Sequence, residues 1–287
     1  MKYLRKFDSV SDMETAIASS EISIMGLAYN GSTPVMEIKT IQPTPPVTKA
    51  TPFYIDVRGG RITFSPPSGL QMSTDGENWT DAREMSLPTG KTYLRVASNQ
   101  STPLKINLAE NSDSDYDIGG NINSLVKVNF ENDTNCYNFY VSSRGFFYNK
   151  SKLKSAGNLI LPATTLTDGC YREMFSGCTS LTTAPELPAT TLASNCYNSM
   201  FNGCASLITA PELPATTLIG YCYGYMFRNC TNLNYIKCLA ANIPVSSCTN
   251  TWLQGVAASG TFVKDSSMSS WTTGANGIPE GWTVEDA

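Results

Sequence analysis

The sequence predicts a multidomain protein that ends in an α/β solenoid with 26-residue repeats. Three observations support this. A block of 26 residues recurs without gaps from Leu161 onward. Short alternating apolar segments, separated by Gly-Gly and Asp-Gly pairs, precede the repeats, and a proline-rich tract sets off the N-terminus. We therefore assign residues 1–42 to an N-terminal α+β attachment unit and linker, 43–126 to a β-sandwich, and 127–287 to the solenoid with its N- and C-terminal caps.

The N-terminal unit combines a helix signal with a hairpin signal. Ser11 and Glu14 form a capping box, which predicts a helix of about two turns. Asn30-Gly31, between ISIMGLAY and PVMEIKT, predicts a β-hairpin. The prolines of 42–46 form a stiff spacer. Because so short a segment has difficulty forming a core alone, we expect this unit to attach to a partner.

The second part contains strand and turn signals typical of an antiparallel, Ig-like sandwich. FYIDVR and RITFS flank Gly59-Gly60, and LQMST and ENWT flank Asp75-Gly76, so each pair predicts a hairpin. TYLRVAS and LKINL follow with alternating character.

The repeats read LPATTL…CY..MF.GC.SL..APE and begin at Leu161, Leu187, Leu213 and a divergent fourth copy at Leu239. Cys170, Met174 and Cys178 lie at i, i+4 and i+8, which predicts one face of a short helix. Gly177 follows as a helix stop, and the prolines of the next segment predict extended chain. One such unit cannot bury its apolar face alone, so neighbouring units must stack.

Comparison of the copies indicates which positions form the core. The Met, Phe and second Cys positions change only to Trp252, Leu253 and Val256 in the fourth copy, so only apolar character is kept. We therefore expect Met200, Phe201 and Cys204 to be buried. Caps are expected at both ends, and their residues are Phe146, Phe147, Leu153 and Leu159 before the repeats and Trp271 and Trp282 after them.

Composition argues against several classes of function. The chain has no histidine, which removes the commonest general base and metal ligand. Charged residues make up 15% with a net charge of −4, which gives nucleic acid no basic patch to bind. No apolar run is long enough for a secretory signal or a membrane span, so we expect maturation in the cytosol and no membrane insertion. We predict no enzyme, no catalytic residue and no cofactor.

Three clusters of side chains are candidate chemical sites. The nine cysteines contain no CxxC pair, and reduced, packed thiols are the favoured interpretation. Asp113, Asp115 and Asp117 alternate like calcium ligands, but the EF-hand pattern fails after them, so we predict no metal site. Glu186 and Glu212 share a repeat position at a spacing compatible with glycosidase carboxylates, although a solvated strand end is favoured.

Tyrosines are the candidate binding residues. Tyr171, Tyr197 and Tyr223 recur in the first three copies and could stack on sugar rings, although half-buried packing is the favoured interpretation. Tyr221 and Tyr225 occur only in the third copy and are better surface candidates. A repeated surface would favour multivalent, individually weak contacts.

The repeat unit resembles the leucine-rich repeats of Bacteroidetes surface proteins of the BspA-like type, as does the ending GTFVK…W…GIPEGWTV. YDIGGNINSLV and the start KYLRKFDSVSDMETA resemble a narrower group, the virion fibre proteins of gut Bacteroidales phages, including crAss-like phages. The resemblance covers about residues 110–287 and, loosely, the N-terminus. It implies a leucine-rich-repeat-like solenoid that faces outward from a virion and carries no catalytic motif.

The expected function is that of a head-fibre or tail-fibre subunit on the virion surface, assembled in the cytoplasm of a bacterial host. Its partners would be other virion proteins, through the N-terminal unit, and a host or mucosal glycan or protein. Self-association is expected, with a trimer favoured over a dimer. The alternative is an adhesin on the bacterial cell surface.

Overall fold

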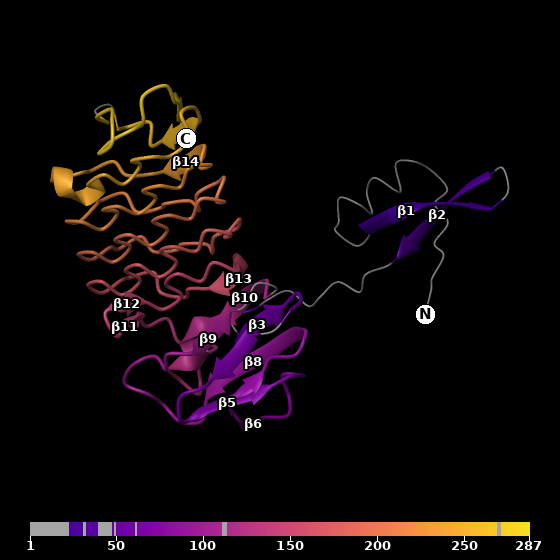
Figure 1. Ribbon diagram of the computed structural model, residues 1–287. Helices are drawn as coiled ribbons and strands as arrows, with labels where there is room; N and C mark the ends of the chain where they lie inside the picture. Colours follow the sequence, from indigo (N-terminus) through magenta and orange to yellow (C-terminus); the bar gives the residue numbers. More distant parts are fainter. Residues whose placement is uncertain are drawn as a thin grey trace. The chain divides into compact units, whose positions relative to one another are not determined.

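The computed structural model describes residues 23–30, 33–39, 48, 50–60, 62–110, 114–268 and 271–287 (Figure 1). The chain divides into two compact units, Met1–Pro46 and Val47–Ala287. None of the described residues belongs to a helix long and apolar enough to cross a bilayer.

The first unit contains an antiparallel pair, β1 (Ser23–Asn30) and β2 (Thr33–Lys39). Asn30 lies opposite Thr33, so the hairpin predicted at Asn30-Gly31 is confirmed. The helix predicted at Ser11 lies outside the described residues.

The second unit begins with two sheets that share one core. The larger has the order β13-β10-β3-β8-β5-β6 and the smaller the order β7-β4-β9. Their strands are β3 (Phe53–Val57), β4 (Ile62–Ser65), β5 (Leu70–Ser73), β6 (Thr80–Asp81), β7 (Met85–Ser86), β8 (Gly90–Val96), β9 (Asn107–Glu110), β10 (Tyr116–Asn121) and β13 (Leu153–Ile160). Phe53 and Leu94 of the larger sheet and Phe64 of the smaller are fully buried and belong to one apolar cluster.

One of the two hairpins predicted in this region is wrong. β3 pairs with β8 and β10, whereas β4 pairs with β7 and β9, so Gly59-Gly60 carries the chain from one sheet to the other. Both strands bury apolar side chains, and facing sheets satisfy both at once. β5 does pair with β6, around a loop organised by Asp75, which accepts hydrogen bonds from the backbone of Glu77 and Asn78.

The larger sheet continues directly into the solenoid. β10 pairs in parallel with β13, the strand that precedes the first repeat. Between them the short 3₁₀ helix η1 (Ile122–Leu125) is buried, and its Ser124 hydroxyl accepts from the Phe53 amide and donates to the Leu94 carbonyl. These bonds fix η1 to β3 and β8, and the pairing of β10 with β13 joins the sandwich to the strand that precedes the first repeat.

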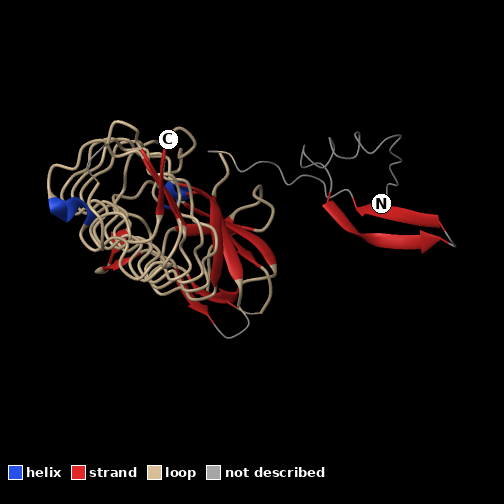
Figure 2. Cartoon of the chain, turned by 90° about the horizontal axis from the view of Figure 1, so that it is seen from above, coloured by secondary structure: helices blue, strands red, loops and turns tan. Residues whose placement is uncertain are grey.

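The fold class predicted for the solenoid is wrong, because no α-helix occurs among the described residues and the architecture is nearly all β. The short helices that were expected at 170–178 and its repeats are chains of consecutive turns, which we call the turn ribbon (Figure 2). The remaining regular elements of this part are β11 (Tyr140–Val141), β12 (Arg144–Gly145), β14 (Tyr235–Cys238), η2 (Ser246–Thr249), β15 (Thr261–Lys264) and β16 (Thr283–Asp286).

Each 26-residue repeat forms one coil of the solenoid, and the first coil begins at Leu161. Along the turn ribbon, backbone hydrogen bonds within one coil alternate with hydrogen bonds to the next coil. The even-numbered amides of the first coil donate within it, as Met174 N–H does to the Tyr171 carbonyl at 3.3 Å. The odd-numbered amides donate to the following coil, as Phe175 N–H does to the Met200 carbonyl at 2.8 Å. Buried backbone groups are thereby satisfied without either a helix or a continuous strand.

Every fourth residue of the turn ribbon has a left-handed backbone. In the first coil these are Gly169 (φ 64°), Glu173 (φ 54°) and Gly177 (φ 78°), and the same positions are left-handed in the next two coils. A left-handed residue in each turn is incompatible with an α-helix. The ribbon nevertheless returns to the same side every four residues, so it buries Cys170, Met174 and Cys178 together. A helix has nearly the same period, which is why the spacing predicted one.

The prediction that the repeated Met, Phe and second Cys positions form the core is confirmed. Met200, Phe201 and Cys204 are each 0% exposed. Phe147, Phe175, Phe201 and Phe227 stack in sequence with ring centroids 5.5 Å apart at each step. The Cys204 thiol donates to the Phe175 carbonyl of the preceding coil at 3.2 Å, and the Cys178 and Cys230 thiols make the equivalent bonds. The second cysteine of each repeat therefore joins consecutive coils in addition to filling space.

Both ends of the stack are covered. Phe53 of β3 stacks on Phe147 at 5.9 Å, so the sandwich closes the N-terminal end. At the other end Trp271 stacks on Trp252 at 5.7 Å, and Trp282 is 7% exposed, as the expected cap requires. β14, β15 and β16 form a parallel sheet beside this cap.

Candidate binding face of the solenoid

Tyr171, Tyr197 and Tyr223 are not available to a ligand. They are 1–2% exposed and stack face to face at 5.9 Å and 6.2 Å. The ladder extends from Phe139 at one end to Trp252 at the other. Burial raises the pKa of each of the three phenols well above its ordinary value, so they remain neutral. These three tyrosines are therefore not binding residues. Each turn of the ribbon has two inward positions, and in each coil the repeated tyrosine fills one of them.

Tyr221 and Tyr225 lie on the outward side of the third coil. Tyr221 is 43% exposed, and Tyr225 is partly exposed. Both have left-handed backbones, with φ of 58° and 57°. The preceding coil has Asn195 and Ser199 at these positions. For a bulky side chain this conformation is uncommon and costs about 1–2 kcal/mol. Such strain is often retained where a side chain has a functional role.

The third coil differs from its neighbours on the outside while keeping their interior. Its inward residues Cys222, Tyr223, Met226 and Phe227 repeat those of the first two coils. Its outward residues do not: Tyr221, Gly224, Tyr225 and Arg228 stand where the second coil has asparagines and a serine. This face of the third coil is therefore an individual surface and not one face of a repeating array.

The outward residues of the third coil support one another. A Cβ on Gly224 would lie only 2.9 Å from Nδ2 of Asn198 in the preceding coil, so the absence of a side chain there leaves room for that amide, beside which the Tyr221 ring also packs. Asn250 donates from Nδ2 to the Tyr225 hydroxyl at 2.8 Å, and the Arg228 guanidinium lies 5.9 Å from the centre of the Tyr225 ring. The Arg228 Nε is buried and makes no hydrogen bond within the protein.

Exposed aliphatic side chains adjoin these tyrosines. Ile219 is 39% exposed and precedes Tyr221 by two residues. Val245, 49% exposed, occupies the same position as Ile219 in the fourth coil. We call Ile219, Tyr221, Tyr225, Arg228 and Val245 the Tyr221 patch. Aromatic, aliphatic and guanidinium groups together are typical of the centres of binding surfaces.

Sequence reasoning identified the two tyrosines of this patch and missed its other three members. The available signal was departure from the repeat, since the position of Ile219 and Val245 holds Thr167 and Ala193 in the first two coils. When an outward repeat position becomes more apolar from one coil to the next, burial cannot explain the change, and a binding role at the surface is indicated.

A repeated surface does exist, on a different side of the coils. Thr164 and Thr165 are exposed, as are their equivalents Thr190, Thr191, Thr216 and Thr217. Thr165 and Thr191 form a parallel bridge, which places them side by side in successive coils. The expectation of multivalent contacts therefore applies to these hydroxyls and not to the tyrosines.

The carboxylates considered as chemical sites are open to solvent or paired. Glu186 and Glu212 are both exposed, and Glu212 forms an ion pair with Lys237 at 3.0 Å. Asp117 pairs with Arg58 at 2.7 Å and Asp115 with Lys154 at 3.5 Å, whereas Asp113 lies outside the described residues. Within the described part of the chain, no three His, Cys, Asp or Glu side chains are arranged to hold a metal ion.

Comparison with known proteins found no matching family model, no matching curated protein and no matching solved structure.

Proposed function

We propose that the chain is a non-enzymatic virion structural protein, a head-fibre or tail-fibre subunit that uses the Tyr221 patch to bind a glycan or protein on a host or mucosal surface. The observation that carries the binding role is the pair Tyr221 and Tyr225, two aromatic side chains at left-handed positions on the outward side of one coil. The assignment to a virion is supported by the resemblance of the sequence to phage fibre proteins.

The patch chemistry favours a ligand with both flat apolar surfaces and hydrogen-bonding groups. Tyrosine rings stack on sugar faces or on apolar side chains at low cost in conformational entropy. The partly exposed Arg228 side chain lies beside the Tyr225 ring, and its guanidinium could donate to a hydroxyl, carbonyl or carboxylate of the ligand.

Binding is tested with the variant Tyr221→Ala/Tyr225→Ala against host cells and a panel of their surface polysaccharides. We expect at least about tenfold weaker binding, since central aromatic side chains commonly contribute more than 1 kcal/mol each. The matched control is Tyr235→Ala, which removes a 36%-exposed tyrosine outside the patch and should leave binding unchanged. Equal binding by the double variant would contradict the proposal.

Attachment is tested by deleting residues 1–40 from the full chain. The unit Val47–Ala287 has its own continuous core, so the shortened protein should fold and retain ligand binding. We expect it to be missing from purified particles and to lose the trimeric or dimeric state of the full chain, as measured by light scattering. Normal incorporation into particles would overturn the docking role of the N-terminal unit.

The alternative, a bacterial cell-surface adhesin, shares the binding patch and differs in location. Immunogold labelling with an antibody against the solenoid distinguishes the two: label on particles supports the fibre, and label on uninfected cells supports the adhesin.

A further inference from the structure

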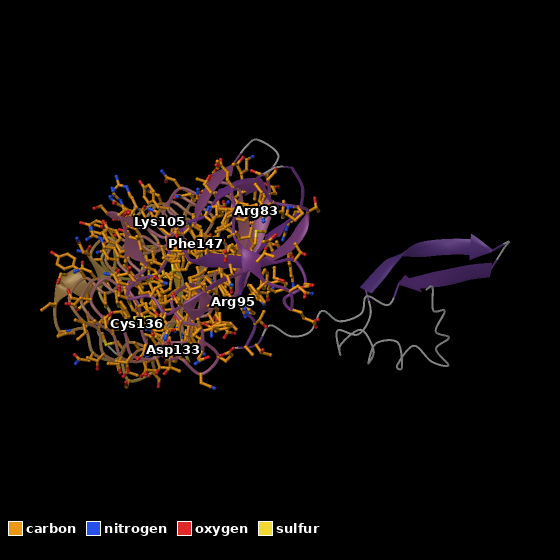
Figure 3. All side chains as sticks on the ribbon, turned by 90° about the horizontal axis from the view of Figure 1, so that it is seen from below. Arg83, Arg95, Lys105, Asp133, Cys136 and Phe147 are labelled. Atoms are coloured by element: carbon orange, nitrogen blue, oxygen red, sulfur yellow. The ribbon has the colours of Figure 1, made fainter. Side chains whose placement is uncertain are left out.

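Cys136 is the one cysteine of this chain that is not buried. It belongs to the segment 127–139, which joins the sandwich to the first coils and also contains Asp133 (Figure 3). The backbone of this segment is tied to the first coil, because Phe139 N–H donates to the Cys170 carbonyl at 2.7 Å. The other eight cysteines are buried in the stack.

Three groups of the first coil surround the Cys136 sulfur. The Thr167 hydroxyl donates to it at 3.7 Å. The Cys170 thiol is close enough to hydrogen-bond with it. The Tyr171 hydroxyl, which is fully buried, makes no hydrogen bond of normal geometry and lies beside the same sulfur. A buried phenol with no other partner, close to a partly exposed sulfur, is an arrangement that would stabilise a thiolate.

We propose that Cys136 and Cys170 form a dithiol site that reacts with small disulfides, with Cys136 as the attacking thiol and Cys170 as the resolving thiol. This inference is independent of the proposed function.

The only reagent that the reaction needs besides the two thiols of the protein is the small disulfide, RSSR, which is the oxidant. The Cys136 thiolate attacks one sulfur of RSSR, which forms a mixed disulfide and releases RS⁻. Cys170 then attacks the Cys136 sulfur, the second RS⁻ leaves, and the two protons from Cys136 and Cys170 end on two RSH molecules. The product is a Cys136–Cys170 disulfide that staples the segment 127–139 to the first coil.

The electrostatics of the site match these roles. Hydrogen bonding, chiefly from Cys170, lowers the pKa of Cys136 to about 7, whereas burial raises the pKa of Cys170. Cys196 and Tyr197 lie further along the same stack, and burial raises the pKa of each of them. Thus Cys136 is the thiol that deprotonates more readily near neutral pH, and the second step is slower than the first because the Cys170 thiol must lose its proton as it reacts.

The site is tested by incubating the full chain with oxidised glutathione at neutral pH and mapping the cysteines by mass spectrometry. We expect the wild type to show a transient glutathione adduct on Cys136, followed by a Cys136–Cys170 disulfide. Cys170→Ser should retain the adduct, and Cys136→Ser should show neither product. Modification of other cysteines first, or an adduct that persists in the wild type, would overturn the proposal.

A second measurement separates activation of Cys136 from simple exposure. The alkylation rate of Cys136 by iodoacetamide should follow a midpoint near pH 7, as set by its lowered pKa. Thr167→Val removes the hydroxyl that donates to the Cys136 sulfur. This variant should stay folded, and its midpoint should move to higher pH. A midpoint at the ordinary cysteine value in the wild type would contradict a stabilised thiolate.

Discussion

At the scale of single residues, the left-handed positions of the turn ribbon differ in how well the residue there tolerates a positive φ. Gly169, Gly177, Asn195 and Asn229 adopt positive φ with little penalty, because glycine has no Cβ and asparagine tolerates this region. Tyr221 and Tyr225 adopt the same conformation without that tolerance. The exposed tyrosines therefore reduce the stability of the coil that presents them, as expected when a surface is kept for binding.

Replacing Tyr221 with asparagine should separate stability from binding. We expect Tyr221→Asn to raise the free energy of unfolding by about 1 kcal/mol, because the left-handed strain is relieved and a 43%-exposed side chain loses little burial. Ligand binding should fall in the same variant. Denaturant unfolding provides the measurement, and the reverse change in the preceding coil, Asn195→Tyr, should lower stability by a similar amount. A Tyr221→Asn protein less stable than the wild type would refute the assignment of strain.

At the scale of the structural element, the turn ribbon depends on its neighbours more than a helix would. An α-helix satisfies its own interior amides, whereas here every second amide donates to the next coil, such as Gly203 N–H to the Arg228 carbonyl at 2.8 Å. The phenylalanine and tyrosine ladders align successive coils with ring planes within about 25° of each other. Removal of one ladder ring from a coil should therefore weaken the packing of that coil against both the preceding and the following coil.

Truncation of one ladder member tests this dependence. Phe201→Ala removes a fully buried ring that stacks on Phe175 and Phe227, and we expect it to lower the free energy of unfolding by about 3–5 kcal/mol. Ile208→Ala, in the same coil at a 53%-exposed position, should change stability by less than about 0.5 kcal/mol. Similar losses in the two variants, measured by denaturant unfolding, would argue against the ladder as the main source of stability.

At the scale of the whole molecule, the sandwich acts as the N-terminal cap of the solenoid. Phe53 closes the phenylalanine ladder, β10 pairs with β13, and the buried residues of both parts form one continuous cluster. A boundary at residue 126 describes a change of architecture along the chain, but both sides of it contribute to the same core.

A fragment of residues 127–287 should therefore fail to fold alone. Its first coil would expose Phe147 and the unpaired edge of β13, which are covered by Phe53 and β10 in the intact protein. We expect aggregation of this fragment, whereas residues 47–287 should be monomeric and unfold in one cooperative transition. Size-exclusion chromatography and circular dichroism measure both, and a stable, soluble 127–287 fragment would show that the solenoid needs no sandwich.

The sequence by itself determined the 26-residue register, the identity of the buried core positions and the tryptophan cap at the C-terminal end, whereas the N-terminal cap proved to be the sandwich, through Phe53. These depend on side-chain chemistry compared at equivalent positions, which the repeats display directly. Only the tertiary structure decided that Cys170–Cys178 is a turn ribbon, that Gly59-Gly60 joins two sheets, and that Tyr171 lies inside while Tyr221 lies outside. The physical reason is that a four-residue turn and a helical turn bury the same spacing, and the amides that distinguish them find their partners about 25 residues away, in another coil.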